Sequence, residues 1–195
     1  MHSTDRAQMT GLDPETQTIM SICCYVTDAQ LALKDTEGWE AIIHHDQAQL
    51  DQMGEWCTRT HGNTGLTAAC IASTTTPQEA ATGLLKYIKQ FVPEPRRSLL
   101  AGNSVHHDKA FLSKGPYKSV ADHLGYRILD VSSIKEAVKR WAPEEVVKGI
   151  PQKQTLHQAR EDILESIEEA RYYKANCFMG RTEGSSDRSL EGSES

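Results

Sequence analysis

The sequence predicts an α/β domain built on a mixed β-sheet. Apolar, β-branched residues dominate the first strongly patterned segment, and longer helical patterns alternate with short apolar strands after it. Proline and glycine separate these segments. The chain has 195 residues, 38% of them hydrophobic and 25% charged, and this length allows one domain with a sizeable core.

The first half of the chain predicts a hairpin or meander followed by helices. Residues 18–27 are rich in β-branched and apolar side chains, and a turn after them leads to a second expected strand that ends at residues 39–43. From Asp46 the pattern becomes helical. Thr76 and Pro77 match an N-cap followed by proline at the first helical position. Apolar residues at helical spacing behind them predict an amphipathic helix: Ala80, Leu84, Tyr87, Ile88 and Phe91.

The second half predicts strands and helices in alternation. Strands are expected at residues 98–101 and 126–131, and a helix at residues 106–113. Another helix should begin at Ser132 or Ser133 as its cap and end at Trp141, before Pro143. The last helix is expected from about residue 158 to 176, with Ile163 and Ile167 on its buried face.

The composition changes after Phe178. Beyond Met179 the chain has one apolar side chain, Leu190, and from Gly180 onward it carries two basic and four acidic residues. Such a segment cannot bury enough apolar surface to offset the entropy lost on ordering. We therefore predict a folded domain over residues 1–178 and a disordered acidic tail over residues 179–195.

Bulk properties limit the class of protein. The net charge of −6 is ill suited to gripping long nucleic acids through many phosphates, although very short oligonucleotides remain compatible with it. The five cysteines form no C-x-x-C pair, which favours free thiols in a reducing, intracellular compartment and no zinc site. The chain lacks an apolar run of about eighteen residues, so we expect no membrane span.

Two aspartates and a histidine are candidates for metal chemistry. Asp108 follows a predicted strand, and Asp162 lies at the start of the last predicted helix, five residues after His157. Carboxylates bind hard divalent cations such as Mg²⁺, and a histidine beside such a cation can act as a general base on water. Taken singly, each residue also has an ordinary interpretation as an exposed helix residue, a helix-dipole partner or a surface histidine.

In combination, these residues belong to a series of segments that resembles the oligoribonuclease family of DEDD exonucleases, in its eukaryotic type. The resemblance covers residues 9–178 and implies the ribonuclease-H-like fold, a mixed sheet flanked by helices. The matching segments, in chain order, are MTGLD (9–13), WCTRTH (56–61) with GL (65–66), AGNSVHHDKAFL (101–112), YRILDVSSIKE (126–136) with RWAPE (140–144), and HQAREDILESI (157–167) with RYY (171–173).

The resemblance implies an enzyme that removes nucleotides from the 3′ end of very short single-stranded RNAs, dinucleotides above all. It implies two divalent cations, Mg²⁺ or Mn²⁺, as cofactors. Asp108 and Asp162 match two of the family's metal-binding carboxylates, and His157 matches its general base. The implied location is the cytoplasm, the mitochondrion or both.

The resemblance also implies the substrate contacts. Leu12 matches a leucine that wedges against the bases, and Trp56 matches the aromatic residue of the base pocket, where stacking is the usual mode of binding. His61 and Ser104 match contacts to the terminal phosphate. A homodimer partner is implied to close a cap over that phosphate with the residues that match Tyr126, Arg127 and Ser132.

The chain departs from the family at its first motif, D-x-E-M-T-G-L. Arg6 and Gln8 stand at the two carboxylate positions, whose spacing puts both side chains on one face of a strand. Residues 1–8 also lack the apolar run of a buried central strand, so we predict that this strand is degraded. Ser21 and Arg160 stand where a glutamate and a leucine are usual.

These departures leave three functions open: an active exoribonuclease, a non-catalytic binder of oligoribonucleotides, and a subunit that pairs with an active one. We expect that a misassigned exon or a splice variant has replaced the true first strand, rather than that the chain is a genuine pseudoenzyme. The reason is that a folded binder would still need its central strand, whereas here the strand and both carboxylates are lost together.

Overall fold

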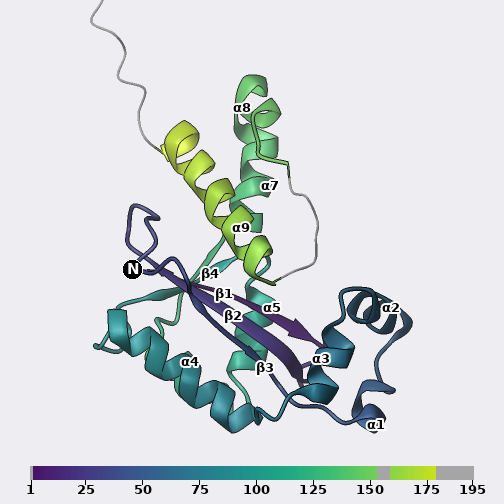
Figure 1. The fold of residues 1–195 in the computed structure, drawn as a ribbon. Helices are drawn as coiled ribbons and strands as arrows, with labels where there is room; N and C mark the ends of the chain where they lie inside the picture. Colours follow the sequence, from purple (N-terminus) through teal and green to yellow (C-terminus); the bar gives the residue numbers. More distant parts are fainter. Residues whose placement is uncertain (1, 153–158, 179–195) are drawn as a thin grey trace, which may run out of the picture.

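A computed structural model describes residues 2–152 and 159–178 of the chain, with the backbone alone for residues 2–6. Five strands form one mixed sheet in the order β3-β2-β1-β4-β5 (Figure 1). The sheet pairs β1 with β2 and β2 with β3 in antiparallel fashion, and β1 with β4 and β4 with β5 in parallel. The strands are β1 (His2–Met9), β2 (Ile19–Thr27), β3 (Trp39–Ile42), β4 (Leu99–Gly102) and β5 (Ile128–Asp130).

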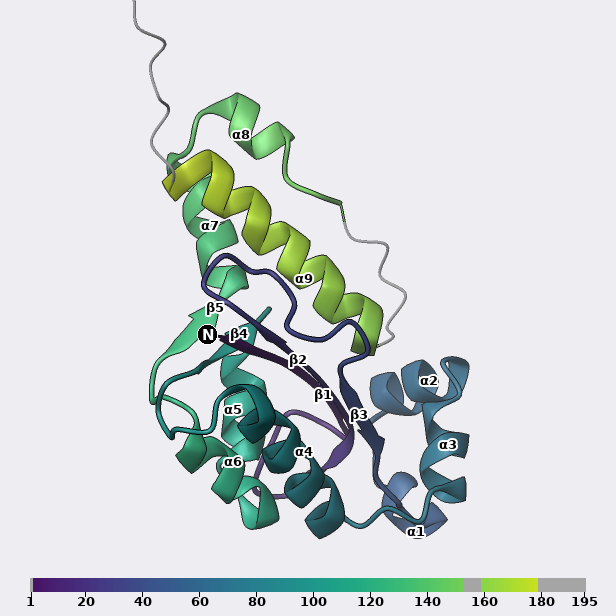
Figure 2. The same ribbon diagram turned by 60° about the vertical axis from the view of Figure 1, so that its left-hand side comes forward.

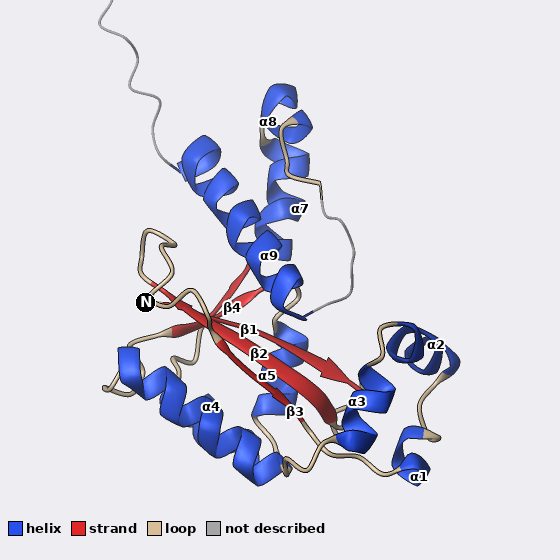
Figure 3. Ribbon diagram, in the orientation of Figure 1, coloured by secondary structure: helices blue, strands red, loops and turns tan. Residues whose placement is uncertain are grey.

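Helices cover both faces of this sheet, which confirms the predicted α/β class (Figure 3). The elements are α1 (Gln47–Leu50), α2 (Glu55–Asn63), α3 (Leu66–Ala72), α4 (Pro77–Phe91), α5 (His106–Leu112), η1 (Gly115–Tyr117), α6 (Lys118–His123), α7 (Val131–Trp141), α8 (Glu144–Lys148), α9 (Ala159–Tyr173) and the π-helical turn η2 (Lys174–Phe178). Within the described ranges, no helix has both the length and the apolar character needed to cross a bilayer.

Strand β2 explains how the two faces are filled. Ile22, Cys24 and Val26 pack with α4, α5 and α6 on one face, whereas Cys23 and Tyr25 pack with α7 and α9 on the other (Figure 2). Every residue of β2 is buried, because side chains on both faces meet helices. The continuous apolar run in the sequence is therefore that of a strand covered on both sides.

The prediction of a degraded first strand needs correction. Residues 2–9 form a complete strand at the centre of the sheet, paired with β2 along its length and with β4 at residues 2–4. The ladder uses backbone groups, which polar residues supply as well as apolar ones. Because residues 2–8 have few β-branched or aromatic side chains, we infer that pairing with β2 and β4 makes this segment a strand.

One prediction of a helix N-cap was confirmed and another was wrong. Thr76 caps α4 in a capping box with Glu79, and Pro77 is the first helical residue, as predicted. The prediction of a serine cap for α7 was wrong, because the side chain of Asp130 accepts a hydrogen bond from the Ser132 backbone N–H. The predicted tail at residues 179–195 lies outside the described residues.

Candidate active site

Asp108 is buried against the central strand. The pairing of β1 with β4 ends at Thr4 and Ala101, and α5 begins a few residues beyond β4. Asp108 lies in the first turn of α5, where its Oδ1 accepts a hydrogen bond of 2.8 Å from the Ala7 N–H. Beyond the end of the β1–β4 pairing, the Asp108 carboxylate therefore accepts a hydrogen bond from a backbone N–H of β1. The side chain is only 6% exposed, so the interpretation of Asp108 as an exposed helix residue is excluded.

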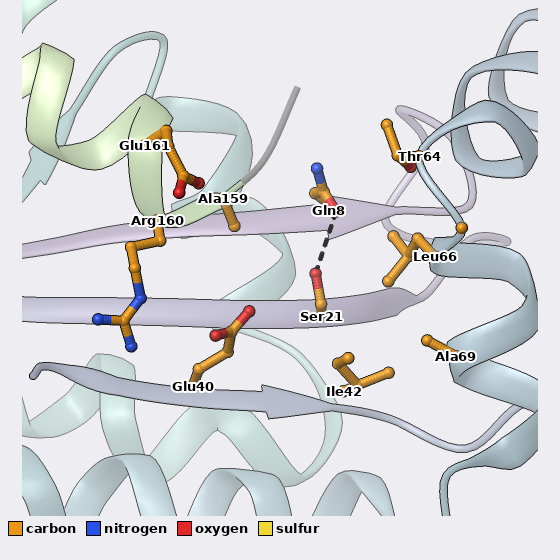
Figure 4. Close-up of a pocket in the computed structure, with 11 residues that line it drawn as sticks. Gln8, Ser21, Glu40, Ile42, Thr64, Leu66, Ala69, Ala159, Arg160 and Glu161 are labelled. Carbon is orange, nitrogen blue, oxygen red and sulfur yellow. Dashed lines mark hydrogen bonds between the residues drawn. The ribbon is translucent and has the colours of Figure 1, made fainter. Parts of the chain in front are cut away.

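Asp162 lies on α9, which packs against the other face of the sheet. It lies in the first turn of α9 and is 7% exposed. The preceding turn residues Ala159 and Arg160 line a cavity of about 320 Å³ together with Gln8 (Figure 4). Asp108 and Asp162 therefore lie in the first turns of two helices that both contact β1.

Three of the four departures from the family line that one cavity. Gln8, Ser21 and Arg160 extend into it from β1, β2 and α9 (Figure 4). The Ser21 hydroxyl donates a hydrogen bond of 3.3 Å to Gln8 Oε1. Where the family motif has a carboxylate, this chain therefore has a neutral amide that is hydrogen-bonded to the neighbouring strand. Arg6, the fourth departure, pairs with Cys23 in the β1–β2 ladder.

Leu12, Trp56 and His61 line a second cavity, of about 490 Å³, which also includes Gln8. Leu12 is 72% and Trp56 58% exposed. His61 is buried, and its Nε2 donates to the Met9 carbonyl at 3.1 Å, which fixes the tautomer of the ring. The rings of Trp56 and His61 lie edge to face, 6.5 Å apart.

A tight turn presents Leu12 to this cavity. The Thr10 hydroxyl donates to Gln17 Oε1 at 2.6 Å and closes the loop between β1 and β2 at its base. At the tip, Asp13 accepts hydrogen bonds from the Glu15 N–H and the Thr16 hydroxyl. These hydrogen bonds lower the pKa of Asp13, with the backbone one making the largest contribution.

Of the residues predicted at the terminal phosphate, His61 lines the cavity of Leu12 and Trp56, whereas the others lie elsewhere in the described chain. Ser104 and Ser132 line a cavity of about 510 Å³ with Asp130, and their hydroxyl oxygens are 3.3 Å apart within one chain. Tyr126 is 73% exposed and borders another cavity, and the Arg127 guanidinium lies 4.5 Å from its ring centre. A single chain therefore brings His61 together with the predicted base contacts, but it leaves Ser104, Ser132 and Tyr126 outside that cavity. His157 lies outside the described residues.

Two residues of this region were missed by sequence reasoning. Asp130 caps α7 and also accepts a hydrogen bond of 3.0 Å from the Ser104 N–H. Glu169 is 1% exposed in the middle of α9. Its signal lies in the spacing of Asp162, Ser166, Glu169 and Tyr173, which places four polar groups on one buried helical face.

The described residues do not offer the ligands of a two-metal site. In the part of the chain that the structure covers, no group of three or more His, Cys, Asp and Glu side chains is arranged to hold a metal ion. Asp108 and Asp162 are carboxylates, the ligand type that hard divalent cations prefer, whereas Gln8 is a neutral amide.

Comparisons with known proteins agree with the fold and the motifs. A family model described as an exonuclease family, RNase T, matches residues 8–170. The mitochondrial oligoribonuclease of Saccharomyces cerevisiae is 40% identical over 189 residues, covering 94% of this chain and 70% of the relative. The mitochondrial oligoribonuclease of Homo sapiens is 41% identical over 187 residues, covering 96% and 77%. The oligoribonuclease of Marinobacter nauticus is 43% identical over 171 residues, covering 88% and 92%.

Solved structures support the fold. E. coli exonuclease I in complex with a dT13 oligonucleotide superposes with a TM-score of 0.58 at 16% identity. The match covers 90% of this chain and 41% of exonuclease I, so the chain spans less than half of that protein. At 16% identity this similarity shows that the fold is shared, and it shows nothing about the details of the site.

Proposed function

Because the chain belongs to the oligoribonuclease family of exonucleases, we propose that it removes nucleotides from the 3′ end of short single-stranded RNAs, dinucleotides above all. One observation carries this proposal. Gln8 on β1 lines the cavity of Trp56 and Leu12, and the adjacent residue of β1, Ala7, is hydrogen-bonded to the Asp108 carboxylate. A platform for bases beside a buried carboxylate is what hydrolysis of a bound oligonucleotide requires.

The described side chains have distinct proposed tasks. Trp56 stacks on a base and Leu12 separates it from its neighbour, which fixes the register of the substrate. A cavity of about 490 Å³ is of the size that binds small ligands. Asp108 and Asp162 would hold the divalent cation that goes with this family's fold, and such a cation would supply Lewis-acid activation of the phosphate and of water. The resemblance assigns the proton transfer from water to His157.

Its cofactor is proposed to be Mg²⁺ or Mn²⁺. Two such ions are implied by the resemblance, and Asp108 and Asp162 match two of the carboxylates that would hold them. A second ion would have to be held by the positions of Arg6 and Gln8, so the proposed activity is expected to be low in this chain. Loss of single electrostatic groups at active sites already lowers turnover about a hundredfold or more.

A homodimer is the proposed assembly. Tyr126 and Arg127 form an exposed cation–π pair that borders a different cavity from that of Leu12 and Trp56. A second subunit could bring such a pair over the substrate, where it would exclude longer RNAs. The relatives named as mitochondrial support a location inside the cell, in the mitochondrion.

Turnover of a 5′-labelled diribonucleotide with Mg²⁺ or Mn²⁺ tests the proposal. Hydrolysis that disappears in His157→Ala and in Asp162→Asn, with both variants still folded, would support the enzyme. A folded wild-type dimer that binds the dinucleotide without hydrolysing it would overturn the enzyme and leave a binding protein. Absence of both binding and turnover would overturn the proposed substrate as well.

A further inference from the structure

The carboxylate of Glu169 lies at the centre of a polar cluster between α9, α7 and the loop that follows β4. Glu169 is 1% exposed. Its Oε1 is 3.0 Å from Lys135 Nζ and accepts a hydrogen bond of 2.7 Å from the Tyr173 hydroxyl. The proposed reaction assigns Glu169 no task, yet burying a carboxylate is costly unless several donors surround it.

The other oxygen of Glu169 orients Asn103. Asn103 Nδ2 lies 3.4 Å from Glu169 Oε2 and donates a hydrogen bond of 2.7 Å to Ser166 Oγ. This leaves Asn103 Oδ1 on the opposite side, where it accepts a hydrogen bond of 3.1 Å from the Ser132 hydroxyl. A flipped amide would put its oxygen against the Glu169 carboxylate. The charge of Glu169 therefore decides which way the Asn103 amide points.

From Asn103 the contacts reach Ser104. The Ser104 N–H donates to Ser132 Oγ at 3.1 Å and to Asp130 Oδ1 at 3.0 Å. Ser104 has a φ of +54°, in the left-handed region that residues with a Cβ adopt only at an energetic cost. The hydrogen bonds of this cluster hold the residue in that conformation.

Through Ser166 the same cluster reaches the turn of α9 that carries Asp162. The Ser166 hydroxyl accepts from Asn103 and donates to the Asp162 carbonyl at 2.6 Å. One asparagine thus links the first turn of α9 with the loop between β4 and α5.

We propose that Glu169 is a positioning residue that, by orienting Asn103, sets Ser104 and the Asp162 turn relative to one another. The functional part of this inference rests on the proposed function, which gives Ser104 a terminal phosphate and Asp162 a cation. The coupling itself depends only on the contacts of the free protein.

The informative variant is Glu169→Gln. Lys135 and Tyr173 both donate to one side of the Glu169 group, so they will keep the glutamine oxygen there. The glutamine NH₂ then faces the NH₂ of Asn103, and two donors cannot bond. The isosteric change therefore reverses the polarity that Asn103 meets. Asn103→Ala is a second variant that removes the link outright.

Tyr173→Phe is the matched control, because it removes a buried hydrogen bond to Glu169 and leaves the side facing Asn103 unchanged. Two measurements separate positioning from mere stability. The first is the backbone amide resonance of Ser104 in the free protein. The second is the Kd for a diadenylate with and without a 5′ phosphate.

We expect the Ser104 resonance to move in Glu169→Gln and in Asn103→Ala, and to stay in Tyr173→Phe. We expect Glu169→Gln to weaken binding of the 5′-phosphorylated diadenylate about tenfold and that of the unphosphorylated one by less than about twofold, the size of one hydrogen bond to a charged group. An unmoved Ser104 resonance, or equal weakening for both dinucleotides, would overturn the inference. A moved resonance in a protein whose wild type binds neither dinucleotide would support the coupling and overturn the proposed function.

Discussion

The two sides of the candidate site are built in different ways. On the carboxylate side, Asp108 and Asp162 are buried on helices that pack against the central strand. On the base side, Leu12 and Trp56 are exposed on a turn and a short helix. Contacts distant in sequence bury the carboxylate side. On the base side, a local turn and a helix present Leu12 and Trp56 to solvent, and the distant contact between His61 and the Met9 carbonyl joins the two segments.

The departures from the family lie where these two sides meet. Gln8 lines both cavities, and Ser21 and Arg160 lie with it in one of them. All three occupy positions where a side chain can change while the ladder of the sheet persists, because that ladder is made by the backbone. Strand β1 therefore forms in this chain even though the two carboxylates of its motif are absent.

The largest effect is expected from restoring those carboxylates. The double variant Arg6→Asp, Gln8→Glu puts two acids back, two residues apart on β1, and should raise kcat/KM on a diribonucleotide about a hundredfold or more. The control is Arg6→Ala, Gln8→Ala, which removes the arginine without adding a ligand. Suppose that the restored variant folds and yet hydrolyses the diribonucleotide no faster than this control. Positions 6 and 8 of β1 would then not bind the proposed cation, and the carboxylate side would not be the catalytic side of the site.

Removal of the stacking platform tests the base side. Trp56→Ala should weaken dinucleotide binding about tenfold, because stacking of one base contributes about 1–3 kcal/mol, while Trp56→Phe should retain most of the affinity. Affinity measured by fluorescence or calorimetry decides this. Ile71→Ala on the neighbouring α3 removes another exposed apolar side chain and serves as the control. Equal losses in Trp56→Ala and Ile71→Ala would mean that the cavity at Trp56 is not the binding site.

The same division explains what the sequence could predict. The cap of α4 at Thr76 and its Pro77 start were predicted because they depend on neighbouring residues alone. The strand at residues 2–9 was not, because β2 and β4 impose it from distant parts of the chain.

The site divides in the same way. Leu12 and Trp56 were identified by motif, and their exposure agrees with the proposed roles. The burial of Asp108 could not be predicted, since a single aspartate on a short helix carries no periodic signal. Glu169 resembles its neighbours Glu165 and Glu168 by type, and only the helical spacing from Asp162 distinguishes it.

The smallest effect concerns the turn that presents Leu12. Asp13 accepts two hydrogen bonds within that turn, and they lower the pKa of its carboxyl. A group whose pKa is depressed by folding stabilises the protein above its unfolded pKa of about 3.9, and this contribution is lost as pH falls through the lower, folded pKa. Asp13→Asn should therefore lower the Tm slightly at pH 7, and the difference from wild type should shrink below about pH 4. Dinucleotide affinity should change by no more than about twofold, as for other exposed positions.

Thermal unfolding followed from pH 7 to pH 3 measures this dependence. The control is Asp51→Asn at the C-cap of α1, since Asp51 also accepts an exposed side-chain hydrogen bond, from Gln47, and does not line the cavity of Leu12. The result bears on how the base side is built. If the Tm difference vanishes in acid and the affinity is unchanged, the hydrogen bond between Thr10 and Gln17 is the main contact that holds the turn. Asp13 would then contribute only to the stability of its tip. A large loss of affinity in Asp13→Asn would mean that Leu12 depends on one exposed carboxylate, and the base side would then be less robust than its local construction implies.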